Sequence, residues 1–150
     1  MTTTVKQILD SKGYDFFNVN PDATVFEALK IMAEKNIGAL MVLDGDGKLI
    51  GMFSERDYAR KIILHGISSK EAKLEDYMST DLYTVDPNTS VLGCMAVMTD
   101  KKVRHVPVLD HNKIVGIISI GDVVNTIIED QKATIQDLEK YITASGYGHQ

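Results

Sequence analysis

The sequence predicts an α/β (α+β) protein in which two β-α-β-β-α repeats are related by a pseudo-two-fold axis and are followed by a C-terminal helix. The main observation is an internal repeat, because residues 21–63 align with residues 87–128. A second observation is the apolar pattern of each copy, which changes between helical spacing and the short continuous runs of buried strands. Length is the third: each half of the 150 residues would be marginally stable alone, so the halves are expected to pack on each other.

The first repeat contains a signal for each of its elements. Thr24 and Glu27 are typical of a capping box at the start of a helix. Residues 39–43 are almost wholly apolar, as in a strand buried on both faces. Gly47 suits the following hairpin turn, because glycine readily adopts positive φ. The predicted elements are a strand at 16–19, a helix at 25–35, strands at 39–43 and 49–53, and a helix at 55–64.

The second repeat shows the same order of signals. Its predicted elements are a strand at 82–85, a helix at 91–101, strands at 105–109 and 113–118, and a helix from Gly121. Short helices at 5–9 and 74–78 match each other, which indicates that each repeat begins with one. We therefore divide the chain into a first repeat (1–68), a second repeat (69–130) and a helical tail (131–150).

The tail has its own helical pattern. Thr134 and Asp137 are typical of a helix cap, so we expect a separate helix to begin there. An apolar stripe follows at helical spacing, formed by Ile135, Leu138, Tyr141 and Ile142. The stripe fits a lid on the core of the same chain and fits equally well a contact between two copies.

Composition narrows the class of protein. A net charge of −5 and a pI near 5.3 argue against general binding of nucleic acid or of anionic membranes. No apolar run approaches the roughly 18 residues of a membrane helix, and the N-terminus lacks the pattern of a secretory signal. Cys94 is the only cysteine, so no intramolecular disulfide can form. We therefore predict a cytoplasmic protein.

The strongest chemical signal is the phrase Gly-h-h-Ser-x-x-Asp, where h is apolar and x is any residue. It occurs in both repeats between a strand and a helix, as Gly51, Ser54 and Asp57 and as Gly116, Ser119 and Asp122. A helix N-terminus attracts phosphate, and a carboxylate near it can accept hydrogen bonds from the hydroxyls of a ribose. The serine and aspartate also fit a simple helix cap. Duplication and the added glycine favour a nucleotide site, since a cap alone does not require the glycine.

Together with the Pro-x-x-Thr/Ser-Val openings at 21–25 and 87–91 and the His-Val-Pro-Val strand at 105–108, these phrases give the chain a family resemblance. It resembles a tandem pair of cystathionine-β-synthase (CBS) domains, or Bateman module, over residues 5–128. The resemblance implies a regulatory module that binds an adenosine-containing ligand (AMP, ADP, ATP, NAD or S-adenosylmethionine) in clefts between the repeats, with no metal required.

The resemblance also implies roles for particular residues. Asp57 and Asp122 would hold ribose, and Ser54 and Ser119 would contact phosphate or ribose. Thr84 would lie near the ligand, where the first repeat has Asn18. Arg104 and His105 match a position where basic residues meet phosphate, although exposed basic residues there also fit a solvated surface. In the first repeat Gly38 and Ala39 take their place, so the two sites are expected to be unequal. Pro107, Arg56 and Arg60 complete the predicted nucleotide-binding set.

The sequence does not favour an enzyme. Glycine-rich phosphate-binding loops and metal-ligand spacings are absent from it. Cys94 lies within a predicted helix on its apolar face, which does not suit a nucleophile. We predict a nucleotide sensor that forms a homodimer and acts on an unidentified protein. The alternative is a structural dimerisation or scaffold module with degenerate pockets.

Overall fold

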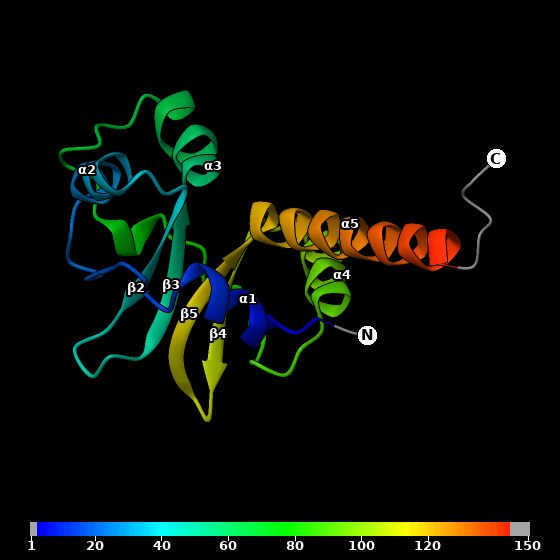
Figure 1. Ribbon diagram of the computed structural model, residues 1–150. Helices are drawn as coiled ribbons and strands as arrows, with labels where there is room; N and C mark the ends of the chain where they lie inside the picture. The colour runs from blue at the N-terminus through cyan, green and yellow to red at the C-terminus, as the bar shows by residue number, and fades with distance from the viewer. Residues whose placement is uncertain (1–2, 145–150) are drawn as a thin grey trace.

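The computed structural model describes residues 3–144 and contains two halves, each built on a β-hairpin with helices beside it (Figure 1). The first half comprises β1 (Asn18–Val19), α2 (Val25–Lys35), β2 (Ala39–Leu43), β3 (Leu49–Ser54) and α3 (Glu55–Asp57), continued by the helical turns η1 (Tyr58–Ile62) and η2 (Ile63–His65). The second half comprises α4 (Val91–Lys101), β4 (His105–Asp110), β5 (Lys113–Ser119) and α5 (Ile120–Ala144). Two shorter elements, α1 (Val5–Lys12) and η3 (Leu74–Asp76), precede the halves. The predicted α/β class is confirmed.

The two hairpins have matching registers. β2 pairs antiparallel with β3, and β4 pairs antiparallel with β5. In the first hairpin Ala39 lies opposite Ser54, and in the second His105 lies opposite Ser119. Each serine at the end of a hairpin is therefore adjacent to the start of the neighbouring strand.

The strand predicted at 82–85 is wrong. Val85 forms only an isolated parallel bridge with Val108, whereas β1 in the first half pairs with β2 over two residues. The Val85 N–H donates to Pro107 O, and the Leu109 N–H donates to Val85 O. The next bond of a parallel ladder would come from the N–H of Pro107, which proline lacks. Pairing therefore stops at Val85.

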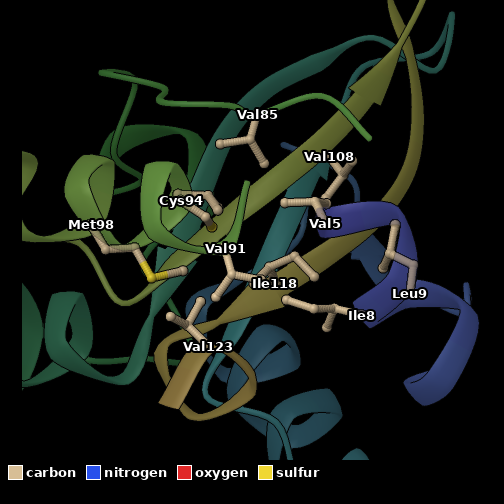
Figure 2. Close-up of a cluster of buried hydrophobic side chains, with 11 residues drawn as sticks. Val5, Ile8, Leu9, Val85, Val91, Cys94, Met98, Val108, Ile118 and Val123 are labelled. Atoms are coloured by element: carbon tan, nitrogen blue, oxygen red, sulfur yellow. The ribbon is translucent and has the colours of Figure 1, made fainter. Parts of the chain in front are cut away.

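Each half is completed by the segment that precedes the other half. Figure 2 shows Val5, Ile8 and Leu9 of α1 within the core of the second half, beside residues such as Val91 and Ile118. Leu74 of η3 lies in the core of the first half. Matching backbone bonds hold the two segments, from Val5 N–H to Thr89 O and from Leu74 N–H to Ala23 O. The division of the chain between residues 68 and 69 stays a prediction. In space, α1 packs in the second half and η3 packs in the first half.

Two other helices differ from expectation. The helix predicted at 55–64 is an α-helical turn followed by a π-helical turn and a 3-10 turn. The separate tail helix is also wrong, because α5 runs without interruption from Ile120 to Ala144. The Thr134 hydroxyl donates to Asp130 O within this helix rather than capping a new one. The capping box at Thr24 is confirmed.

The tail does not act as a lid on the core. Ile135, Leu138 and Tyr141 are 55%, 57% and 71% exposed, and Figure 1 shows α5 extending beyond the rest of the second half. Within residues 3–144, none of the helices has the length and apolar character needed to span a bilayer.

Candidate functional site

The two repeated phrases cap the helices that follow them. The Ser54 N–H donates to Asp57 Oδ2 at 3.0 Å, and the Asp57 N–H donates to Ser54 Oγ at 3.1 Å. In the second half the corresponding Ser119–Asp122 bonds are 2.8 and 3.1 Å. The capping interpretation therefore holds at both places. The Asp57 and Asp122 carboxylates are largely shielded from solvent, with 15% and 22% of their side chains exposed.

A cavity of about 460 Å³ lies beside Asp57, between the two halves. Its volume is within the range of small-molecule sites. Eight of the predicted site residues line it: Ala39, Ser54, Arg56, Asp57, Arg60, Arg104, His105 and Pro107. Both halves thus contribute predicted residues to one cavity.

Basic side chains dominate the charge of this cavity. Five of them line it, namely Arg56, Arg60, Lys102, Arg104 and His105, alongside the acidic Glu55, Asp57 and Asp81. This concentration occurs in a chain with a net charge of −5. Clustered guanidinium and ammonium groups are suited to phosphate oxygens.

A hydrogen bond joins the two halves at the rim of the cavity. Arg56 Nη1 donates to the backbone carbonyl of Lys102 at 2.7 Å. Lys102 ends α4 in the left-handed conformation, with φ 57°, which turns the chain toward β4. Arg56 follows Ser54 by two residues, so the first hairpin and the end of α4 are held together directly beside the site.

The Asp57 carboxylate is occupied by groups from its own half. Its Oδ2 accepts from the hydroxyl of Ser54, and its Oδ1 accepts from the hydroxyl of Ser79, both at 3.1 Å. The ammonium of Lys61 lies 3.3 Å from Oδ1 and also donates to Tyr77 O. The two serine hydroxyls are neutral donors that a ligand hydroxyl could replace.

His105 of the second half also lines the cavity and is half-buried. Burial lowers the pKa of its imidazole, and the charges of Lys12 and Arg104 act in the same direction. The carboxylates of Asp122 and Glu55 oppose them. The net lowering of the pKa favours neutral imidazole.

Four predicted residues do not line this cavity: Asn18, Thr84, Ser119 and Asp122. Thr84 is exposed, whereas the preceding Leu82 and Tyr83 line the cavity. The predicted contact is therefore displaced by one residue, from Thr84 to Tyr83. Asp122 forms an ion pair with Lys12 at 2.7 Å. The ligand roles of these four residues stay predictions.

Sequence reasoning missed other residues of the lining, among them Ser79, Tyr83 and Lys102. Lys102 belongs to the basic cluster before the second hairpin and could have been found from that position. Ser79 carries no signal in the sequence, because its contact with Asp57 depends on the path of the chain after η3.

Comparison with known proteins identifies the family. The CBS domain model matches residues 5–64 and again 74–129, so the chain belongs to the CBS-domain family, as a tandem pair. Paired CBS domains are regulatory modules, and CBS domains generally bind adenine nucleotides.

Relatives and solved structures agree with this assignment. "CBS domain-containing protein CBSX3, mitochondrial" of Arabidopsis thaliana is 40% identical over 94% of this chain and 72% of its own. A candidate signal-transduction protein with CBS domains from Burkholderia ambifaria is 48% identical, with a TM-score of 0.83 over 86% of this chain and 96% of its own.

A third similar protein is Hypoxic Response Protein I, whose solved structure has two coordinated zinc ions. It is 30% identical, with a TM-score of 0.69 over 83% of this chain and 98% of its own. Among residues 3–144 of the present chain, three or more His, Cys, Asp or Glu side chains do not gather in a way that could hold a metal ion.

Proposed function

We propose that this protein is a regulatory module that binds an adenosine-containing nucleotide in the cavity beside Asp57, without catalysing a reaction. AMP, ADP, ATP, NAD and S-adenosylmethionine are the candidate ligands. The proposal rests on one observation: a single cavity between the halves contains both a shielded carboxylate and five basic side chains. A nucleotide requires both features, because its ribose offers hydroxyl donors and its phosphate is an anion.

Each part of the ligand has a proposed partner. The ribose hydroxyls replace the hydroxyls of Ser54 and Ser79 on the Asp57 carboxylate. The phosphate meets the basic side chains of both halves, including Arg56 and Arg104. The base lies against the less polar side chains of the lining, where Tyr83 offers an aromatic surface.

Regulation follows from the position of the ligand between the halves. Arg56 already joins them through the carbonyl of Lys102, and a bound phosphate adds further bonds to both. A ligand shifts a conformational equilibrium only by its differential affinity for the two states. We propose that the braced state is the one that an unidentified protein partner recognises.

Isothermal titration calorimetry with AMP, adenosine and inorganic phosphate tests this function. We expect AMP to bind more tightly than either fragment, because it alone engages the carboxylate and the basic cluster together. AMP should also raise the melting temperature, since a ligand of the folded state adds RT ln(1 + [L]/Kd) to stability. If millimolar AMP, ATP and NAD gave neither heat nor a thermal shift, the proposal would be wrong.

A second candidate function is dimerisation, with the pockets as remnants, and α5 favours it. Val124, Ile128, Ile135 and Leu138 are 44%, 43%, 55% and 57% exposed and fall on heptad core positions, with Gln131 at the core position between Ile128 and Ile135. We propose that α5 pairs antiparallel with α5 of a second copy.

Sedimentation analysis distinguishes the two candidates. Leu138→Glu places charge within the stripe and should give a monomer, whereas Lys140→Glu on the same helix should stay dimeric. A monomeric variant that still binds AMP would show that nucleotide binding does not depend on the dimer. A wild-type monomer at all concentrations would exclude the pairing of α5.

We place the protein in the cytoplasm. Cys94 is buried, and burial, together with the charge of Asp122, raises the pKa of its thiol to about 11. A buried thiol with a raised pKa is unreactive, and a single cysteine in the sequence fits a reducing compartment. The Arabidopsis relative is named as mitochondrial. Microscopy of the full-length protein with a fluorescent fusion tests the compartment.

A further inference from the structure

In the first half, Ser79 joins the end of the hairpin to the Asp57 carboxylate by two neutral groups. Its backbone N–H donates to Met52 O at 2.8 Å, and its hydroxyl donates to Asp57 Oδ1 at 3.1 Å. The hydroxyl is a neutral donor that a ligand hydroxyl can replace, while the ion pair of Lys61 with the same carboxylate, at 3.3 Å, stays in place.

In the second half, one ammonium group makes both of these contacts. Lys12 Nζ donates to Ile117 O at 2.9 Å and to Asp122 Oδ2 at 2.7 Å. Ile117 and Asp122 are the counterparts of Met52 and Asp57 in the repeat alignment. Lys12 therefore makes the contacts that Ser79 makes in the first half. Its ammonium hydrogen-bonds the Asp122 carboxylate at 2.7 Å, whereas the cation beside Asp57, Lys61, lies 3.3 Å from Oδ1 and the direct donors there are serine hydroxyls.

The difference arises from the segments that lead into the two halves. Val5 and Leu74 are equivalent, since their N–H groups bond to the equivalent carbonyls of Thr89 and Ala23. From that common point α1 continues as a helix to Lys12, whereas η3 ends at Asp76. The additional helical turns carry the side chain of Lys12 to the end of the second hairpin.

The second half also lacks the basic residues of the cavity. The counterparts of Arg56, Arg60, Lys102, Arg104 and His105 are Gly121, Asn125, Asn36, Gly38 and Ala39. None of these five replacements can carry a positive charge. At Asp122 the cation is Lys12, which already pairs with the carboxylate. Although burial would raise the pKa of Asp122, the hydrogen bonds from Lys12 and Ser119 hold it below its usual value.

We propose that Lys12 closes the half-site at Asp122, so that the chain holds one nucleotide, in the cavity at Asp57. This inference rests on the proposed function and adds the stoichiometry and the residue that sets it. The ammonium of Lys12 occupies Oδ2 of the Asp122 carboxylate, and none of the five positions equivalent to the basic residues of the cavity carries a cation for a phosphate. The duplicated phrase thus serves a ligand in one half and an internal ion pair in the other.

Carboxyl-carbon NMR of the full chain, combined with calorimetry, tests the inference. With AMP we expect one molecule bound per chain, a shift of the Asp57 carboxyl signal and an unchanged Asp122 signal. Two molecules per chain with shifts at both carboxyls would overturn the closure of the second half-site. An absence of binding altogether would instead overturn the proposed function, and the Lys12 variants would then decide the inference separately.

Lys12→Met removes the cation and keeps an unbranched side chain, while Lys12→Arg keeps the charge as the matched control. The probe for these variants is adenosine, because the Asp122 carboxylate without its ion pair would repel a phosphate. We expect millimolar adenosine to shift the Asp122 signal in Lys12→Met but not in Lys12→Arg or the wild type. If Lys12→Met remains folded by circular dichroism and its Asp122 signal does not respond, Lys12 is not the closing group.

Discussion

Arg56 and Lys102 are joined by a 2.7 Å hydrogen bond from the guanidinium of one half to the backbone carbonyl of the other. Both residues line the cavity, so this direct link between the halves is also part of the candidate site. A guanidinium has five donors and uses one of them here, which leaves the others for a phosphate.

Arg56→Ala should therefore weaken AMP binding more than adenosine binding. Loss of a hydrogen bond to a charged group is worth roughly 1.5–3 kcal/mol, so we expect AMP affinity to fall by about tenfold or more. Calorimetry with both ligands measures the difference. Lys132→Ala on α5 is the control and should leave both affinities unchanged; equal losses for AMP and adenosine in Arg56→Ala would contradict a phosphate contact.

The two repeated aspartates should respond differently to the same substitution. Asp57→Asn keeps an oxygen that can accept the Ser54 N–H bond of the cap, but it removes the charge that accepts the ribose hydroxyls. We expect AMP affinity to fall by roughly ten- to a hundredfold in Asp57→Asn and to stay near the wild-type value in Asp122→Asn. Isothermal titration of the two variants in parallel checks this; an equal loss in both would show that the half-sites are equivalent.

His105 should link binding to pH. In the structure the pKa of His105 is lowered, chiefly by burial, whereas a phosphate beside it would favour the protonated form and raise the pKa. Binding of AMP then takes up a proton at His105. The affinity for AMP should therefore increase as the pH falls toward and below about 6.5, the ordinary pKa of histidine. Titrations from pH 8 to pH 6 in buffers of different ionisation enthalpy measure the uptake.

His105→Asn is the control for this effect. The phosphate of AMP titrates in the same range, and that contribution is common to the wild type and the variant. The difference between the two pH profiles therefore isolates the imidazole. Identical profiles would mean that His105 does not face the bound phosphate.

The exchanged position of α1 can be tested through Gly116. A Cβ at this position would lie 2.7 Å from Leu9 Cδ2, closer than carbon atoms pack, so Gly116→Ala should destabilise the protein by about 1–3 kcal/mol. Gly45→Ala is the control, because a Cβ there meets no atom within 4 Å. Urea unfolding measures both, and equal stability of the two variants would contradict the packing of α1 against β5.

Much of the fold could be predicted because the repeat shows itself in local patterns. The capping box at Thr24 and the apolar run that became β2 depend on neighbouring residues alone, and both are confirmed. The strand at 82–85 failed because pairing is a property of two segments: the missing N–H of Pro107 lies in the partner.

The candidate site, too, could be predicted only in part. The serine and aspartate of each repeated phrase are placed by local capping and could be located from the sequence. The contacts of the two carboxylates could not be predicted from the sequence, because Ser79 and Lys12 belong to segments that are distant in the chain. The inequality of the two sites was predicted from Arg104 and His105, while the ion pair with Lys12 required the structure.

A crystal structure of the protein with AMP tests the central claim most directly. The account predicts one AMP per chain in the cavity between the halves, with ribose hydroxyls on the Asp57 carboxylate and the phosphate among Arg56, Lys102 and Arg104. Crystals grown at saturating AMP in which this cavity is empty, or in which the ribose lies on Asp122 instead, would contradict it.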